Sequence, residues 1–297
     1  MSEDTVTMDL ETQQIFESEW EGLGLSNDFI FCKVMQEEGL LEELVHLILP
    51  QLKFTKLVVQ TQKSIEEGLD IHGVRFDVFA LDDEGNAIEI EMQVLDTGSI
   101  PKRMRYYGSI NDMQMLEKGV TYGRLKDSYV IVISPFDQYK CGLHKYTFTY
   151  RCHEKENLEM GDGTTKIFLN AVGTADDVSK GLKAFLDYVA GKSSDDPYVQ
   201  KLEVAVEMAK ADKALRREYM TLFMRDLINQ EKGIQKGIQQ GIQKGIQKGI
   251  QKGRDEERRK SIEEMLRRGK SPEEIADFCG YSITQVKSVQ DSISVTI

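Results

Sequence analysis

The sequence predicts an α/β protein with a mixed central sheet flanked by helices, followed by a mostly helical C-terminal region. A strand hairpin over residues 74–94 supplies the centre of the sheet. A helical pattern at 101–119 and a continuous apolar strand at 128–134 follow it, an order typical of a sheet with helices on its faces. From residue 197 onward the patterns are helical, apart from one glycine-rich repeat.

The hairpin contains two strands of different character. Residues 74–81 are rich in β-branched and aromatic side chains, whereas residues 87–94 alternate between apolar and polar side chains. Residues 82–86, DDEGN, form the turn, and Gly85 is available for the position that needs a positive φ. We therefore expect a three-residue loop over 83–85, which fixes the register of the two strands.

This register places two carboxylates opposite each other. The loop pairs Asp82 with Asn86, and counting back along the antiparallel ladder pairs Asp77 with Glu91. Opposed like charges destabilise a sheet by about 0.2–1 kcal/mol. A hard divalent cation such as Mg²⁺ would remove the repulsion, because it prefers carboxylate oxygens. Gln93 lies one pleat further along the same face. The competing interpretation is the solvated polar face of an ordinary hairpin.

Two charged residues near this pair have alternative interpretations. Glu89 lies on the same face as Glu91, either as a spare cation ligand or as an exposed residue at the sheet edge. We favour the exposed edge residue. Lys33 either points toward the carboxylates or lies on a solvated helix face, and we favour the solvated lysine.

The flanking elements follow from local patterns. One helix is expected between the cap-like Asn27-Asp28 pair and Pro50, which stops it. Residues 1–24 lack a clear period and form a loose arm or a short leading helix. Proline in the first turn and glycine at the end bound the helix at 101–119. The other expected elements are strands at 54–61, 128–134, 146–152 and 166–171 and helices at 178–190 and 197–231.

Bulk properties narrow the class of protein. A chain of 297 residues is long enough for one large domain or two smaller ones. Apolar content of 40% and charged content of 30% are globular values. The net charge of −12 argues against a protein that coats nucleic acid by bulk attraction, but it is compatible with a nuclease whose cleft is locally basic.

Cysteine usage indicates a reduced, cytoplasmic protein. The four cysteines have no framework spacing, the chain starts with the acidic stretch MSEDTVTMDLE, and no apolar run approaches the length of a membrane span. Cys141, His144, Cys152 and His153 offer zinc-ligand chemistry, but their spacing matches no tight structural zinc site. We favour free cysteines that serve as small buried apolar side chains.

Five sequence blocks together resemble a known family. In chain order they are NDFIFCKVM at 27–35, GVRFDV at 73–78, IEMQ at 90–93, KRMRYYGS at 102–109 and SYVIVI at 128–133. The ordered set is similar to the recombination-promoting nuclease/putative transposase (Rpn) family within the PD-(D/E)XK nuclease superfamily. The likeness is close over residues 27–173 and loose beyond them. It implies a restriction-endonuclease-like core and a nuclease that acts on DNA.

The resemblance also implies roles for the paired carboxylates. Asp77 and Glu91 would hold Mg²⁺, or another divalent cation, together with the backbone carbonyl of Met92. Gln93 stands where the wider superfamily has lysine, and the Rpn-like branch resembles this chain in having glutamine. Glutamine orients a water molecule but carries no charge, so catalysis is expected to depend more on the metal and on nearby arginines.

A basic and aromatic cluster follows the second hairpin strand. Arginine pairs bidentately with phosphate, and tyrosine stacks on bases or donates a hydrogen bond to phosphate. Arg103 and Arg105 are the first candidates for substrate contact, whereas Tyr107 has a core position as its competing interpretation. The predicted substrate-binding residues are Arg75, Lys102, Arg103, Arg105 and Tyr106.

A low-complexity tract, GIQKGIQQGIQKGIQKGIQKG, spans residues 233–253, with glycine at every fourth position. Six glycines in a helix cost about 5–6 kcal/mol relative to alanine. Glycines four residues apart allow a second helix to approach the backbone closely. Their row winds about 40° around the helix with each repeat, so a partner helix would have to follow it in a right-handed supercoil. A right-handed helical self-association tract and a semi-flexible linker are the two interpretations, and we favour the helix.

The region around the tract is basic. Residues 231–270 hold 12 Lys or Arg against 6 Asp or Glu, a net charge of +6. Such a segment suits the backbone of a nucleic acid. A solvated charged face and contact with an acidic partner are the competing interpretations.

Residues 254–297 carry clear helix boundaries. Gly269 and Gly280 end helices, and capping boxes at 271–274 and 282–285 begin the next ones. The pattern resembles a helix-turn-helix, but the last helix has a single cation, so a packing or oligomerisation module is an equal interpretation.

The predicted domain organisation has five parts. They are an N-terminal arm (1–24), a PD-(D/E)XK nuclease-like domain (25–192), a helical connector (193–231), the repeat helix or linker (232–253) and a small helix-turn-helix-like module (254–297). Homo-oligomerisation through the C-terminal helices and a small inhibitory protein partner are further expectations, and no membrane contact is expected.

The leading functional hypothesis is a Mg²⁺-dependent DNA endonuclease. By the resemblance, it would promote DNA breakage and recombination, in association with mobile elements or genome defence. The alternative is a catalytically weak or inactive nuclease fold that serves as an oligomeric DNA-binding or regulatory module.

Overall fold

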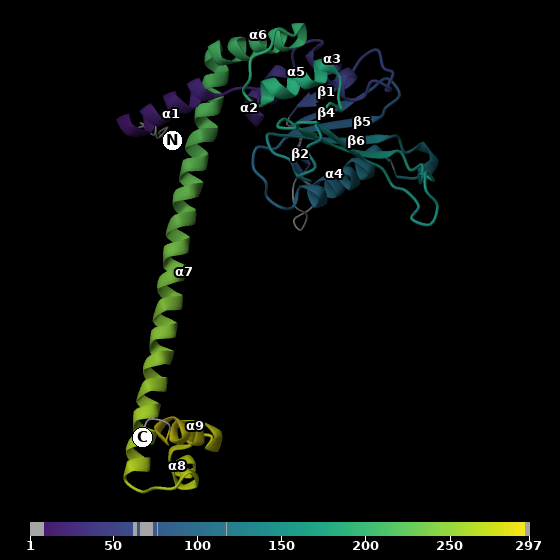
Figure 1. The fold of residues 1–297 in the computed structure, drawn as a ribbon. Helices are drawn as coiled ribbons and strands as arrows, with labels where there is room; N and C mark the ends of the chain where they lie inside the picture. Colours follow the sequence, from purple (N-terminus) through teal and green to yellow (C-terminus); the bar gives the residue numbers. More distant parts are fainter. Residues whose placement is uncertain (1–8, 62–63, 66–73, 76, 117, 295–297) are drawn as a thin grey trace. The chain divides into compact units, whose positions relative to one another are not determined.

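The computed structural model describes residues 9–61, 64–65, 74–75, 77–116 and 118–294. The chain divides into two compact units, Met1–Thr221 and Leu222–Ile297. The described part of the first unit contains the strands and the helices that pack on them. The described part of the second unit is helical (Figure 1).

A mixed six-stranded sheet forms within the described residues of the first unit. Its strand order is β1-β4-β5-β6-β8-β7; β5, β6 and β8 are parallel to one another, and the other pairs are antiparallel. A separate two-stranded sheet pairs β2 with β3. The strands are β1 Val58–Thr61, β2 Ser64–Ile65, β3 Val74–Arg75, β4 Val78–Leu81, β5 Ala87–Met92, β6 Ser128–Ser134, β7 Lys145–Phe148 and β8 Thr164–Asn170.

Helices cover both faces of the larger sheet, as predicted for an α/β protein. α4 lies on one face, and α2, α3 and α5 lie on the other (Figure 1). The helices are α1 Leu10–Gly22, α2 Asp28–Val34, α3 Leu40–Ile48, α4 Ile100–Met115, the 3₁₀ turn η1 Tyr122–Arg124, α5 Lys180–Val189, α6 Pro197–Ala211, α7 Lys213–Arg267, α8 Pro272–Cys279 and α9 Ile283–Ser294.

The hairpin has the predicted loop and register. Val78 pairs with Ile90, and the backbone N–H of Asp82 donates to the carbonyl of Asn86 at 3.1 Å. Gly85 has a φ of +84°, the left-handed conformation that the sequence assigned to it. The Asp82 carboxylate holds the turn by accepting from the backbone N–H groups of Glu84 and Asn86.

The first hairpin strand is shorter than predicted. Residues 74–75 form β3, which pairs with β2 in the smaller sheet, and β4 begins at Val78. Asp77 therefore lies just before β4 rather than inside a continuous strand. The other strands that were predicted from 54, 146 and 166 also shift at their ends, whereas β6 has the predicted bounds.

α4 packs on the face of the sheet that carries the odd-numbered residues of β4 and β5. Phe79 and Ala87 are buried there against Tyr107 and Ile110 of the helix. Further along, Met104 packs with buried side chains of β6 and β8. Because β5 lies between β4 and β6, this face is at the centre of the sheet and not at an edge.

Two predicted helices are each divided in the structure. The helix expected from Asn27 to Pro50 is two helices, α2 and α3, because Gly39 takes a φ of +82° and starts the second one. The expected helix at 197–231 breaks at Asp212, whose extended backbone separates α6 from α7. The Asp212 side chain then accepts from the N–H groups of Ala214 and Leu215 in the first turn of α7.

α7 is one continuous helix of 55 residues that includes the whole repeat tract. The tract is therefore helical in the structure, as the favoured interpretation requires, and self-association through it stays a prediction. The helix also passes the predicted domain boundaries at 231 and 253 without a break.

The C-terminal boundaries agree with the predicted caps. Gly269 and Gly280 have φ values of +82° and +67°, and Ser271 forms a capping box with Glu274. Ser282 and Gln285 exchange reciprocal 3.2 Å hydrogen bonds, the second predicted box. The side chains that form the core of this small bundle are Ile262, Ile275 and Val286.

None of the described helices combines the length and the apolar character that crossing a lipid bilayer requires.

Candidate functional site

Asp77 and Glu91 meet at the end of the hairpin where β5 approaches its last residue. The backbone N–H of Asp77 donates to Glu91 Oε1 at 3.2 Å, and the backbone N–H of Met92 donates to Asp77 Oδ2 at 2.9 Å. Reciprocal hydrogen bonds between β5 and the residue that precedes β4 thus bring the two carboxylates together. Cys32 Sγ of α2 donates to the Asp77 carbonyl at 3.2 Å.

The electrostatics of the pair follow from burial. Glu91 is 6% exposed, and Asp77 is half-buried. Burial is the main cause that raises the pKa of Glu91, to about 8, and the adjacent Asp77 carboxylate adds to the shift. The Arg103 guanidinium acts in the opposite direction. Without a compensating cation, the pair favours a state in which one of its carboxyls is neutral.

Glu89 is fully buried, so the expectation of an exposed edge residue is wrong. It lies on the central strand β5, beneath α4, at 0% exposure. Asn111 Nδ2 of α4 donates to Glu89 Oε2 at 2.9 Å, whereas Glu89 Oε1 and Asn111 Oδ1 lack hydrogen-bond partners. Burial and then Glu91 raise the pKa of Glu89 well above its usual range. The shift favours the neutral form of this buried carboxyl.

Gln93 is hydrogen-bonded to the first turns of α4. Arg103 Nη2 of α4 donates to Gln93 Oε1, and Gln93 Nε2 donates to the carbonyl of Leu95 at 2.5 Å. The Arg103 guanidinium also lies 5.7 Å from the centre of the Tyr107 ring. Burial raises the pKa of the Tyr107 hydroxyl, which stays protonated. The structure thus brings a permanent positive charge to the glutamine.

The other predicted substrate-binding residues are placed differently. Lys102, Arg105 and Tyr106 are exposed on α4, and no contact within the described residues joins Lys102 or Arg105 to the carboxylates. The side chain of Arg75 lies outside the described residues. Lys33 pairs with Glu218 at 2.9 Å and lies over the Phe29 ring, so it belongs to a surface ion pair and not to this site.

The cysteines and histidines that were weighed as zinc ligands do not converge. His144 is buried and its Nδ1 bonds to Asp177 at 2.9 Å, while Cys141 is exposed and donates to the Tyr139 carbonyl. Cys152 contacts Glu154. Across the described ranges, no cluster of three or more His, Cys, Asp or Glu side chains has the arrangement of a metal site. A cation at the Asp77–Glu91 pair would therefore take its other ligands from backbone oxygen and water.

The sequence analysis did not single out Asn111, the α4 residue that bonds to Glu89, although its position on the helix could have indicated it. Asn111 is 1% exposed and follows Met104, Tyr107 and Gly108 on the face of α4 that packs against the sheet. A lone amide on an otherwise apolar helix face has to meet a polar group of the core. That group is Glu89.

Comparison with known proteins identifies a family to which the chain is similar. The model of a family described as PD-(D/E)XK nuclease family transposase matches residues 25–226, which include the hairpin, α4 and the remaining strands. The chain belongs to this family. No curated protein and no solved structure matches the chain. The mixed sheet with helices on both faces is the α/β fold of the PD-(D/E)XK nucleases, and Asp77, Glu91 and Gln93 all lie within the matched residues.

Proposed function

We propose that this PD-(D/E)XK family member is a divalent-cation-dependent endonuclease that cuts DNA at the Asp77–Glu91 pair. The observation that carries the proposal is the convergence of the two carboxylates: Glu91 accepts from the backbone N–H of Asp77, and Asp77 accepts from the backbone N–H of Met92. Family membership supports a nuclease-type function linked to transposition. DNA breakage in recombination or in mobile elements is the biological role that follows from that kinship.

The donor chemistry of the site fits a hard cation such as Mg²⁺. The converging donors are carboxylate oxygens, and burial together with mutual repulsion makes the doubly ionised pair unfavourable without a cation. Asp77 and Glu91 would hold the ion, with the backbone carbonyl of Met92 as a third ligand. When bound, such an ion polarises a phosphoryl oxygen and lowers the pKa of a coordinated water.

The protein's own side chains have separate roles in this proposal. The Gln93 amide orients the attacking water, and its Oε1 is itself fixed by Arg103. Arg103 supplies the positive charge that a lysine provides in the wider superfamily, and its guanidinium binds the phosphate whose charge grows in the transition state. The aromatic ring of Tyr107 and the hydrogen bond to Gln93 keep the guanidinium in place.

Nicking of supercoiled plasmid by the full chain, with Mg²⁺ or with EDTA, tests this function. The wild-type chain should nick the plasmid only with Mg²⁺, and Asp77→Ala should reduce the rate to the background. Circular dichroism and thermal unfolding verify that the variant is folded. Equal nicking by both proteins, or none by either, would support a non-catalytic nuclease fold that acts as a binding or regulatory module.

A further inference from the structure

α7 carries a row of five lysines through the repeat tract, all of them exposed. They occupy every fourth position except one, where Gln240 interrupts the row. No Asp or Glu occurs between Glu231 and Asp255. The lysine row consists of Lys232, Lys236, Lys244, Lys248 and Lys252.

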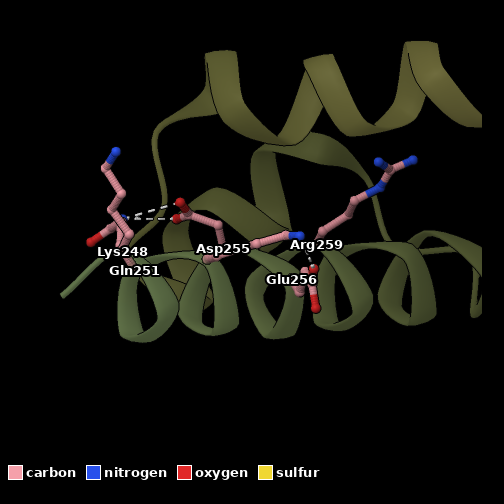
Figure 2. Close-up of a pocket in the computed structure, with 6 residues that line it drawn as sticks. Lys248, Gln251, Asp255, Glu256 and Arg259 are labelled. Atoms are coloured by element: carbon pink, nitrogen blue, oxygen red, sulfur yellow. Dashed lines mark hydrogen bonds and ion pairs between the residues drawn. The ribbon is translucent and has the colours of Figure 1, made fainter. Parts of the chain in front are cut away.

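The lysine row has few anionic partners among the described residues. Lys252 lies 3.9 Å from Glu256, and the other four amino groups have no described carboxylate within 4 Å. Figure 2 shows the end of the row, where Gln251 donates to Asp255 at 3.1 Å and Lys248 extends away from that acid. Among the described residues, the positive charge of Lys232, Lys236, Lys244 and Lys248 therefore has no carboxylate partner, whereas that of Lys252 is partly offset by Glu256.

The spacing of the lysine row suits a regular polyanion. In an α-helix, residues four apart are separated by about 6 Å along the axis and by about 40° around it. The row therefore extends about 30 Å and turns about 200° from Lys232 to Lys252. Duplex DNA presents about one phosphate per 1.7 Å, so some 18 phosphates lie along that length.

The lysine row winds around the helix, so a flat surface such as a bilayer cannot contact all of it. Lysines on opposite sides of one straight helix cannot all face the plane of a bilayer, and the five isoleucines of the tract turn in the same way. A helix in the DNA major groove, in contrast, has a phosphate strand on each side. A row that moves from one side of the helix to the other can contact first one strand and then the other.

We propose that the lysine row of α7 binds the phosphate backbone of duplex DNA, as a contact additional to the carboxylate site. The contact does not depend on the proposed catalysis, because it involves no cation and no reacting group. It reads no bases, since lysines that neutralise phosphate carry no sequence information by themselves. Five such contacts contribute about −4.5 to the slope of log affinity against log salt, at about −0.9 each.

The test is the salt dependence of duplex binding by the full-length chain. A fluorescent 30-base-pair duplex is titrated with the protein in EDTA, between 50 and 200 mM salt, and fluorescence anisotropy reports binding. The test variant changes all five lysines of the row to glutamine, the residue that already occupies position 240. Glutamine and lysine have similar helix propensities, and circular dichroism verifies that the helix remains.

A matched control removes the same charge elsewhere. It replaces five exposed lysines of the first unit by glutamine, namely Lys53, Lys56, Lys118, Lys155 and Lys180. The variant of the row should have a slope shallower by about 4 and, by the same relation, a roughly 10²–10³-fold smaller loss of affinity over that salt range. The control should retain the slope of the wild type to within about one contact.

Other outcomes would overturn the proposal. Equal effects of the two variants would assign the binding to net charge, and an unchanged slope in the variant of the row would assign it to another surface. Two further probes extend the test. Replacing the five isoleucines of the tract by alanine should leave the slope unchanged, and a loss as large as that of the lysine variant contradicts direct contact. Lysine-dependent binding to phosphatidylserine vesicles as strong as to the duplex would contradict DNA as the partner.

Discussion

Asn111 of α4 donates a 2.9 Å hydrogen bond to the buried carboxyl of Glu89 on β5, and this contact joins the helix to the central strand beside the candidate site. Burial, followed by the Glu91 carboxylate, raises the pKa of Glu89 well above its usual range, which favours the neutral carboxyl. A neutral carboxyl has one donor, and Asn111 Oδ1 is an acceptor without one. The pair therefore has the groups needed for a carboxyl–amide pairing in the core.

The first prediction concerns the stability of this pair. Asn111→Ala should lower the free energy of unfolding by about 1–3 kcal/mol, because it leaves a buried carboxyl without its donor. Glu89→Gln should cost less, since an amide still accepts from Asn111 and donates to it. Urea unfolding at pH 7, followed by circular dichroism, measures both. A greater loss in Glu89→Gln than in Asn111→Ala would mean that Glu89 is ionised in the folded chain.

The second prediction concerns pH. Burial, followed by the Asp77 carboxylate, raises the pKa of Glu91 from 4.5 to about 8. Between these values the unfolded chain releases the proton and the folded chain keeps it, so stability falls as the pH rises. The slope is at most about 1.4 kcal/mol per pH unit for one such group.

Urea unfolding in EDTA, at steps from about pH 5 to pH 8, measures this slope. Glu91→Gln should flatten it, and the remaining slope includes the contribution of Glu89, whose pKa is raised in the same direction. Wild-type stability that does not change over this range would contradict a raised pKa. Addition of Mg²⁺ should reduce the decline, because the cation favours the ionised pair.

The third prediction concerns Arg103. Arg103→Ala should lower the Mg²⁺-dependent nicking rate by about 10²–10³-fold, the range for removing one donor that stabilises transition-state charge. Arg103→Lys should recover only part of the rate, because a lysine lacks the planar fork that meets Gln93 and phosphate together. Thermal unfolding of each variant separates a catalytic effect from a loss of fold. Nicking by Arg103→Ala at the wild-type rate would exclude this role.

The fourth prediction concerns the glycines of the repeat tract. A Cβ atom added at any of the six would meet no atom within 4 Å, so replacing all six by alanine adds helix stability without a clash. The gain should be about 5 kcal/mol at roughly 0.8–1 kcal/mol each. Amide hydrogen exchange over residues 233–253 should slow accordingly.

Gly269 is the matched control for this series. Its φ of +82° is strained for alanine, so Gly269→Ala should destabilise the end of α7 while the tract variants stabilise its middle. Exchange that is equally fast in wild type and in the six-alanine variant would mean that the tract is not helical in solution.

Local chemistry explains what the sequence could predict. Gly85 and the short turn set the hairpin register, and the register alone brings Asp77 to Glu91. The caps at Ser271 and Ser282 depend on side chains three residues away, so they too are visible in the sequence. These features need no knowledge of the rest of the fold.

The sequence-based predictions were wrong or undecided where the outcome depends on how distant segments pack together. Alternation along β5 shows which residues share a face, but it does not show that α4 covers this face and buries Glu89. The sequence also left Arg103 and Arg105 as equal candidates. They lie about 200° apart around a helix, so the orientation of α4 on the sheet decides which one meets Gln93. Gly39 divides α2 from α3 because its positive φ changes the chain direction, which an apolar period does not reveal.

Two isosteric changes on one strand test the carboxylate site against its nearest control. Glu91→Gln and Glu89→Gln make the same carboxyl-to-amide change two residues apart on β5, but of the two side chains it is Glu91 that accepts from the backbone N–H of Asp77. Single-turnover plasmid nicking is followed in Mg²⁺ for both variants and for the wild type. We predict that Glu91→Gln loses cation-dependent nicking while Glu89→Gln keeps a rate close to that of the wild type. Nicking by Glu91→Gln at the wild-type rate would contradict a cation-dependent nuclease centred on this pair.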